Sequence, residues 1–113
     1  MSRLARLEID GGTKLCLVRV HGEIDISNAP EMSAALEAAM PNGAETLLVD
    51  LSGTTYLDSA GVQLLFLLAQ RLRTRRQQLR IVVPEEAPIR GVLELAGMPR
   101  VIPMQGRLGE EPA

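Results

Sequence analysis

Ser59 is the residue of this sequence best placed to take part in chemistry. It follows an apolar run over residues 47–51 and a polar turn, and the motif 58–61, Asp-Ser-Ala-Gly, directly precedes an apolar-rich segment over residues 62–76. A serine between a strand and the start of a helix is expected at the surface, beside backbone N–H donors. Ser59 could therefore be modified or recognised by a partner. It could also be a plain helix N-cap, a role compatible with modification.

A hydrolytic site is a second possibility for this serine. His21, together with Asp25, Asp50 or Asp58, could supply the base and the orienting carboxylate of a triad. However, the sequence around Ser59 lacks the Gly-x-Ser-x-Gly elbow of serine hydrolases, and His21 is expected to be a surface turn residue. We therefore predict that the protein is not an enzyme.

Metal ions and cofactors have no recognisable site in the sequence. One histidine and one cysteine are too few for a structural zinc site, and the acidic residues lack the spacing of a calcium-binding loop. Residues 10–13, Asp-Gly-Gly-Thr, lack the spacing and the lysine of a phosphate-binding loop. We expect no metal and no cofactor, so that any nucleotide would be brought by a partner protein.

The composition predicts a single small domain. The chain has 113 residues, of which 46% are hydrophobic, enough for one two-layer core. Gln63 and Gln70 interrupt the longest apolar segment, and we expect neither a signal peptide nor a membrane span. Cys16 has no second cysteine with which to form a disulfide. We therefore expect a cytoplasmic protein without membrane insertion.

A local cluster of arginines stands out against the formal net charge of −2. Its members lie near the end of the apolar-rich segment and just beyond it: Arg71, Arg73, Arg75, Arg76 and Arg80. Cations near the last turn of a helix complement the helix dipole, and the chain has only two aromatic residues to stack on bases. We therefore predict no direct contact with nucleic acid.

The first twenty-odd residues predict a β-hairpin. Apolar and charged residues alternate over residues 5–10, which is typical of a strand with one wet face. Asp10-Gly11-Gly12 is a tight-turn signal, and residues 15–20 form a second arm that Gly22 ends.

The first helix is predicted to begin near Asn28. Pro30 suits its first turn, and Glu31 would complete a capping box with Asn28 as the N-cap. Residues 41–43, Pro-Asn-Gly, should end this helix.

The second half predicts two central strands, a third helix and a short edge strand. Residues 46–51 and 79–83 are continuous apolar runs, as expected for strands in the middle of a sheet. The third helix begins at Pro88 and ends at Gly97, and residues 101–102 suffice only for an edge strand.

The helix over residues 62–76 has more apolar surface than one buried face requires. Leu64, Leu67 and Leu68 widen its apolar stripe. Part of this excess could face a partner, or the helix could be packed between the sheet and a neighbouring helix.

Together these elements predict an α/β fold. The sheet is mixed, with an opening antiparallel hairpin, parallel strands, and right-handed crossovers that place the helices mainly on one face. The domain is expected over residues 4–104, with a flexible C-terminal tail over residues 105–113.

The ordered combination of motifs resembles the STAS domain family, and more narrowly a stand-alone anti-sigma factor antagonist. The resemblance covers about residues 4–104 and rests on four segments: Gly-Glu-Ile-Asp at 22–25, Leu-Val-Asp-Leu at 48–51, Asp-Ser-Ala-Gly at 58–61, and Leu-Glu-Leu-Ala-Gly-Met at 93–98.

This resemblance implies a non-enzymatic switch that binds a serine-kinase anti-sigma factor, releases a sigma factor, and is inactivated when the kinase phosphorylates it. The phosphorylated residue would be Ser59. Asp25, Asp58, Ala60 and Gly61 would share the partner-binding surface with it. Many members have a second serine where this chain has Ala60. A phosphatase could reverse the modification.

The phosphate would lie where several backbone N–H groups lack helical partners, so the domain should stay folded while the complex is weakened. An alternative is that the same fold is an accessory subunit of a transport or signalling complex, for example in lipid transport, without control by phosphorylation. The excess leucines would then form a permanent interface.

Overall fold

A computed structural model describes residues 5–11 and 14–109 of the chain. In chain order its elements are β1 (Ala5–Gly11), β2 (Leu15–Ile24), α1 (Ala29–Ala39), β3 (Thr46–Asp50), β4 (Thr54–Leu57), α2 (Ser59–Thr74), β5 (Gln78–Val82), α3 (Pro88–Leu95), the 3-10 helix η1 (Met98–Arg100) and β6 (Met104–Gln105).

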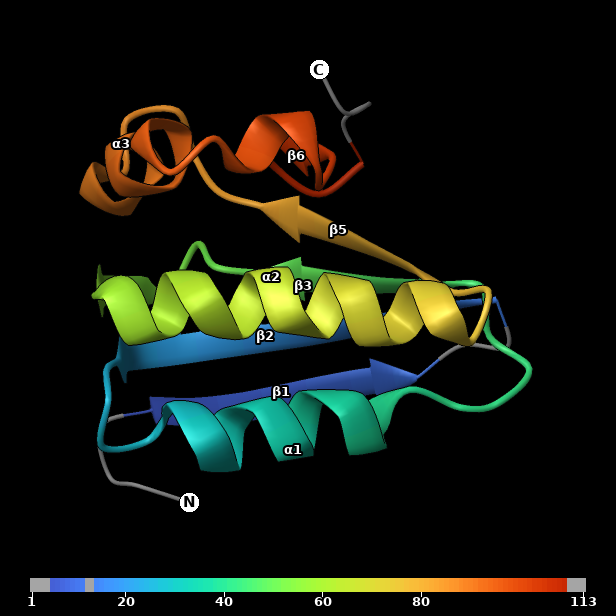
Figure 1. Cartoon of the computed structure of the whole chain (residues 1–113). Coiled ribbons are helices and arrows are strands. Elements are labelled where there is room, and N and C mark those ends of the chain that lie inside the picture. The colour runs from blue at the N-terminus through green and yellow to red at the C-terminus, as the bar shows by residue number, and fades with distance from the viewer. Residues whose placement is uncertain (1–4, 12–13, 110–113) are drawn as a thin grey trace.

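One mixed sheet organises these elements, in the order β1-β2-β3-β5-β6 (Figure 1). β1 pairs with β2 antiparallel, and β3, β5 and β6 continue the sheet in parallel. The short β4 pairs in parallel with the last residues of β2, beyond the stretch that β3 occupies. The antiparallel pairing of the predicted hairpin, the central strands and the parallel crossovers are confirmed. Asp10 and Gly11, predicted in the turn, are still part of β1, and Gly12 lies outside the described residues.

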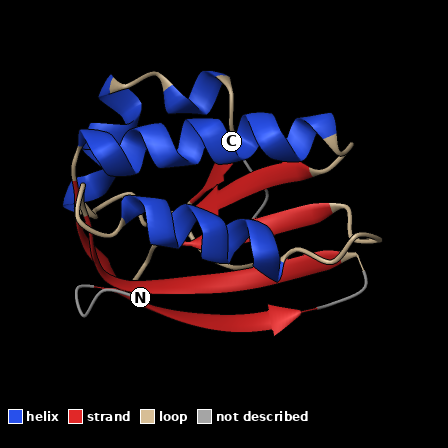
Figure 2. Cartoon of the chain, turned by 60° about the horizontal axis from the view of Figure 1, so that its bottom comes forward, coloured by secondary structure: helices blue, strands red, loops and turns tan. Residues whose placement is uncertain are grey.

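The helices cover one face of the sheet (Figure 2). Alternate residues of each strand point to opposite faces, so Cys16, Val18 and Val20 of β2 join the main core beneath the helices. The buried Cys16 thiol donates to the carbonyl of Ala39 at 3.4 Å, and burial, with a smaller contribution from Asp10, raises its pKa.

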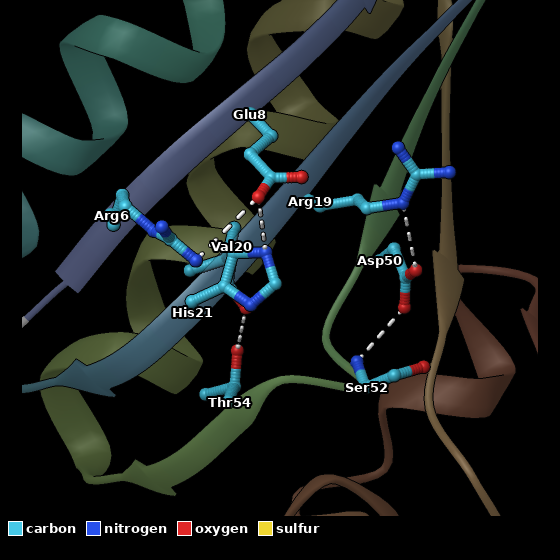
Figure 3. A network of polar contacts seen from close by, with 8 residues as sticks. All are labelled: Arg6, Glu8, Arg19, Val20, His21, Asp50, Ser52 and Thr54. Atoms are coloured by element: carbon cyan, nitrogen blue, oxygen red, sulfur yellow. Dashed lines mark hydrogen bonds and ion pairs between the residues drawn. The ribbon is translucent and has the colours of Figure 1, made fainter.

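The opposite face, which we call the open face, is mostly polar. A small apolar cluster of Leu17, Leu48 and Val82 lies at its centre. Polar side chains lie on the same face, and Figure 3 shows five that carry ionisable groups: Arg6, Glu8, Arg19, His21 and Asp50.

Two strand predictions are wrong at their ends. β2 does not stop before Gly22, which has φ 103°, but continues to Ile24 after a register shift. The last strand is not residues 101–102, which form a turn, but Met104–Gln105. Gln105 is buried and bonded to Arg80, so it belongs to the sheet and not to the predicted tail.

Strand β4 was not predicted from the sequence. Its residues resemble a polar turn, because Thr54 and Thr55 lack an apolar pattern. The buried Thr54 hydroxyl donates to the carbonyl of Val20 at 2.9 Å, which satisfies a polar side chain in the interior and holds β4 against β2 (Figure 3).

The leucines of α2 are largely accounted for by packing. Leu64 and Leu68 are buried, and only Leu67 is exposed. Since α2 contacts both α1 and the sheet, it needs a broad apolar stripe. The excess apolar surface is therefore mainly core.

Candidate functional site

Two segments meet at the end of the sheet where β2 and β4 finish. One is the turn over residues 25–28, which joins β2 to α1, and the other is the start of α2. They are held together because Leu57 of β4 lies opposite Ile24 of β2, and the Asp58 N–H donates to the Ile24 carbonyl at 3.3 Å. The sheet thus brings together Asp25 and the motif 58–61, which are far apart in the sequence.

Ser59 is the first residue of α2 and is exposed. It is not the N-cap, contrary to one interpretation of the sequence: the N-cap is Asp58, whose Oδ1 accepts from the amides of Ala60 at 2.9 Å and Gly61 at 3.2 Å. No hydrogen bond to the Ser59 hydroxyl is found among the described residues. Because the preceding aspartate caps the helix, the serine hydroxyl remains free to react or to be recognised.

The expected surroundings of a phosphate at this position need a correction. Of the first amides of α2, those of Ala60 and Gly61 are already paired with the Asp58 carboxylate. Fewer N–H groups are therefore free than the sequence suggested, and a negative charge lies close by. The Asp58 carboxylate therefore already offsets part of the positive end of the helix dipole, which reduces the stabilisation that a phosphate on Ser59 would gain from it.

Gly61 acts through packing, because it is buried. A Cβ at this position would lie 2.8 Å from Leu57 Cγ and 3.2 Å from Ile24 Cγ2. Glycine therefore lets the first turn of α2 approach the ends of β2 and β4 closely, which places Ser59 at the edge of the domain.

Asp25 folds its own turn. Its Oδ1 accepts from the backbone N–H of Ser27 at 2.8 Å and from the Ser27 hydroxyl. These hydrogen bonds lower the pKa of the Asp25 carboxyl below its usual value, and the bond from the Ser27 hydroxyl makes the largest contribution. The group therefore presents a negative charge next to the start of α2.

Asn28 has a different role from the predicted capping box. It is fully buried and makes no side-chain cap bond. Its Oδ1 accepts from the Asp25 amide at 2.9 Å, and its Nδ2 donates to the Glu23 carbonyl at 2.8 Å. Asn28 thus fixes the turn that carries Asp25. An asparagine soon after a strand end was the available signal, but it fits an N-cap equally well.

A groove of about 510 Å³ runs between α1 and α2 and begins beside the serine. Ala60 and Gln63 line it from α2, and Pro30 lines it from α1. Ile26, at its rim, is 80% exposed. The groove is also lined by two of the leucines that the sequence pattern indicates could face a partner, Leu64 and Leu67. The groove itself was not predicted, because helical periodicity does not show which two helices become neighbours.

The histidine does not join the serine in a triad. His21 lies within β2, not in a turn, and its Nε2 is 3.3 Å from Glu8 Oε1 on the open face (Figure 3). Asp50 pairs with Arg19 at 3.9 Å and accepts from the Ser52 amide at 2.9 Å. The helices lie on the other face, so these groups do not form a hydrolytic site with Ser59.

The arginine cluster is dispersed in the folded chain. Arg71 of α2 pairs with Glu37 of α1 at 3.2 Å, and Arg75, just after α2, contacts Asn42 in the loop after α1 at 3.5 Å. Arg80 instead lies on the open face and donates to Gln105 at 2.8 Å.

Over the described ranges 5–11 and 14–109, no three histidine, cysteine, aspartate or glutamate residues are grouped as metal ligands. No helix in the same part of the chain combines the length and apolar character needed to cross a membrane.

Comparison with known proteins gives consistent matches over nearly the whole chain. A family model described as "Mlab, STAS domain" matches residues 7–104. This chain is 31% identical over 103 residues to BtrV of Bordetella bronchiseptica, and the match covers 90% of this chain and 84% of BtrV. BtrV is provisionally named an anti-sigma factor antagonist.

Two solved proteins share the fold. The crystal structure of an anti-sigma factor antagonist from Mycobacterium paratuberculosis matches with a TM-score of 0.78 and 25% identity, covering 92% of this chain and 87% of that one. The anti-sigma factor antagonist SpoIIAA in its unphosphorylated form matches with a TM-score of 0.70 and 16% identity, covering 88% and 87%. The phosphorylated form of Bacillus SpoIIAA gives 0.62 and 17%, covering 88% and 90%.

Proposed function

This chain belongs to the STAS domain family and to its anti-sigma factor antagonists, and we propose that its unmodified form binds a serine-kinase anti-sigma factor and thereby releases a sigma factor. Proteins of this family act by binding and not as enzymes. We further propose that the kinase phosphorylates Ser59 and so ends the interaction, and that a phosphatase restores it in the cytoplasm.

The observation that carries this proposal is the free, exposed hydroxyl of Ser59 at the first position of α2. Asp58 caps the helix in its place. The Asp25 turn and the groove between α1 and α2 both lie near the serine, and Ile26 of that turn lines the groove. A partner that covers this end of the domain must cover the serine as well.

Each predicted binding residue has a distinct part in this surface. Asp25 supplies a charge that a basic group of the kinase can recognise, and Asp58 both caps α2 and presents its second oxygen. Ala60 forms the wall of the groove nearest to Ser59. Gly61 does not touch the partner, because it is buried, but it positions the other residues.

A phosphate on Ser59 should leave the domain folded. The dipole of α2 stabilises a negative charge at this end by roughly 0.3–1 kcal/mol, and repulsion from Asp58 offsets part of this. The described fold is shared with SpoIIAA, which has been solved both with and without phosphorylation. The modification therefore acts on the complex and not on the stability of the chain.

The effect on the complex is larger. About two negative charges with tightly held water enter an interface that fits a hydroxyl group, which costs several kcal/mol. A loss of about 4 kcal/mol weakens binding roughly a thousandfold.

The test compares affinity capture by the wild-type chain, Ser59→Asp and Ser59→Ala, followed by phosphosite mapping on the wild type. Ser52→Asp is a matched control, because Ser52 is also exposed but precedes β4 and lies outside α2. We expect wild type and S52D to retain an ATP-binding kinase, S59D to lose it, and the captured kinase with ATP to phosphorylate Ser59. Equal capture by S59D, or phosphorylation elsewhere, would contradict the proposal.

The description of the matching family model as "Mlab, STAS domain" keeps the accessory-subunit alternative open. In that case the groove between α1 and α2 would hold a permanent partner, and Ser59 would not be modified. Leu67→Asp, at an exposed position in the groove, would then abolish capture of that partner, whereas S59D would leave it intact. The same pair of variants therefore separates the two functions.

A further inference from the structure

Strand β1 (Ala5–Gly11) forms the outer edge of the sheet, and no described strand pairs with its outer side (Figure 1). Its backbone N–H and C=O groups on that side are available to another strand. Ile9, on the helix-covered face of this strand, is 57% exposed although it is large and apolar. An edge with open backbone groups and an exposed apolar side chain favours strand addition.

The charges of β1 are arranged along the open face. Arg6 and Glu8 lie two residues apart, with side chains 70% and 47% exposed, and their nearest charged atoms are 3.5 Å apart (Figure 3). Glu8 also contacts His21 at 3.3 Å. Asp10 follows on the same face, opposite Leu17 of β2. Thus the edge presents one positive group followed by two negative groups.

This charge order is complementary to itself in an antiparallel pair. When two copies of β1 pair antiparallel, the numbers of any two residues that lie opposite each other add up to the same value, which defines the register. This value must be even, because only every second residue of β1 directs its backbone groups outward. With a sum of 14, Leu7 lies opposite Leu7 of the second copy, and Arg6 lies opposite Glu8 in both directions. Every charged pair between the two strands is then attractive.

The neighbouring registers are less favourable. A sum of 12 places Arg6 opposite Arg6. A sum of 16 forms two attractive Arg6–Asp10 pairs but places Glu8 opposite Glu8 between them, so it has one repulsive pair that the sum of 14 lacks. A sum of 18 places Glu8 opposite Asp10. Since like charges directly opposite each other destabilise strand pairing, the sequence of β1 selects the register centred on Leu7.

The helix layer leaves room for this arrangement. A two-fold axis perpendicular to the sheet places the helices of both copies on the same side. α1, the nearest helix, packs against β2 more closely than against β1. The second copy would cover Ile9, and it would not use Ser59, so the inference is independent of the proposed phosphorylation.

We propose that two copies of this chain associate edge to edge through antiparallel pairing of β1, in the register that places Arg6 opposite Glu8. The sheets of the two copies then form one continuous sheet. A single strand pair buries less surface than a standard stable interface, so the dimer should be weak and should form only at high protein concentration.

Sedimentation equilibrium of the full chain, from about 10 µM to about 1 mM, tests the proposal with paired charge reversals. Arg6→Glu places glutamates opposite each other, and Glu8→Arg places arginines opposite each other. R6E should dimerise at least tenfold more weakly than the wild type, because positions 6, 8 and 10 are then all negative and no register contains an attractive pair. E8R loses the register centred on Leu7 but can still pair its new arginine with Asp10, so R6E is the decisive single variant. An equimolar mixture of R6E and E8R should associate, because every pair between the two variants is again attractive, and the double variant R6E/E8R should dimerise like the wild type.

The control variants are Arg100→Glu and Glu85→Arg, which change the net charge equally at exposed positions outside β1. Both should dimerise like the wild type. Circular dichroism establishes that each variant is folded. A wild-type chain that stays monomeric up to about 1 mM, or a mixture of R6E and E8R that associates no better than R6E alone, would overturn the proposal. Equal weakening by R100E would also overturn it, because a general charge effect would then explain the result.

Discussion

The carboxylate of Asp58 and the amide of Gly61 are joined by a hydrogen bond of 3.2 Å across the first turn of α2. Through this bond Asp58 caps the helix, so the exposed Ser59, which lies between the two residues, takes no part in capping. Helix capping and the proposed phosphorylation therefore fall on two adjacent side chains, and each can be changed without the other.

The first prediction follows from this division. Asp58→Ala removes the acceptor of two helix amides and should lower the free energy of unfolding by about 1 kcal/mol. Ser59→Ala, which removes a hydroxyl without a described partner, should change it by less than about 0.5 kcal/mol. Urea denaturation followed by circular dichroism measures both. A loss in S59A as large as that in D58A would show that the serine caps the helix after all.

The second prediction concerns two glycines that lie within helices. Gly61→Ala should destabilise the fold by about 1–3 kcal/mol, because the new methyl group would overlap Leu57 and crowd Ile24. In α3, a methyl group at Gly91 would have open space around it, with no neighbouring side chain within 4 Å, so Gly91→Ala should stabilise by about 0.4–1 kcal/mol. Opposite signs in thermal or urea unfolding are the expected result, and equal signs would refute the close approach at Gly61.

The third prediction concerns the buried amide of Asn28. Asn28→Ala leaves the Asp25 N–H and the Glu23 carbonyl without their partner and should cost about 1–3 kcal/mol of stability. Asn28→Asp keeps an acceptor for the Asp25 N–H, but it replaces the donor to the Glu23 carbonyl with a second carboxylate oxygen, which is unfavourable in this buried site. The two variants therefore differ in whether the bond to Asp25 can form. Amide hydrogen exchange at Asp25 should speed up in N28A more than in N28D. Equal exchange in both variants would show that the first bond is not formed.

The fourth prediction is a pH dependence of the turn at Asp25. Because hydrogen bonds from Ser27 favour the charged carboxylate, its pKa in the folded chain lies below the ordinary value. The resulting stabilisation is present above the ordinary pKa and is lost as the pH falls through the lowered one. Carboxyl-detected NMR titration measures the midpoint directly.

Ser27→Ala should raise the Asp25 pKa toward the ordinary value, because the hydroxyl is the largest cause of the shift. Ser33→Ala, in α1, is the matched control and should leave the midpoint unchanged. An unchanged midpoint in S27A would mean that the hydroxyl does not stabilise the carboxylate.

Local patterns in the sequence were sufficient for the main elements. Alternation over residues 5–10 predicted β1, and continuous apolar runs predicted the central β3 and β5, because burial on two faces requires them. Pro88 and Gly97 delimited α3 because proline suits a first helical turn and Gly97 adopts a left-handed φ of 79°. The exposed Ser59 at a helix start was predicted in the same way.

Contacts between distant segments could not be predicted by such patterns. Thr54 is buried in a strand only because Val20, thirty-four residues earlier, offers its carbonyl. Asn28 could cap a helix or fix a turn, and the choice depended on Glu23 and Asp25 being positioned by the end of β2. Polar side chains have several local solutions of similar energy, so the surrounding chain selects among them.

The sequence by itself determined the order of the elements, the apolar faces and the position of the serine at a helix entrance, because these depend on residues close together in the chain. Only the tertiary structure decided that Asp58 caps α2 in place of Ser59, that the Asp25 turn lies beside it, and that a groove opens between α1 and α2. Adjacent aspartate and serine are both good N-caps, so the local sequence left that choice open. The position of the Asp25 turn depends on the pairing of β2 with β4, and the groove depends on the packing of α1 against α2, and both join segments far apart in the chain.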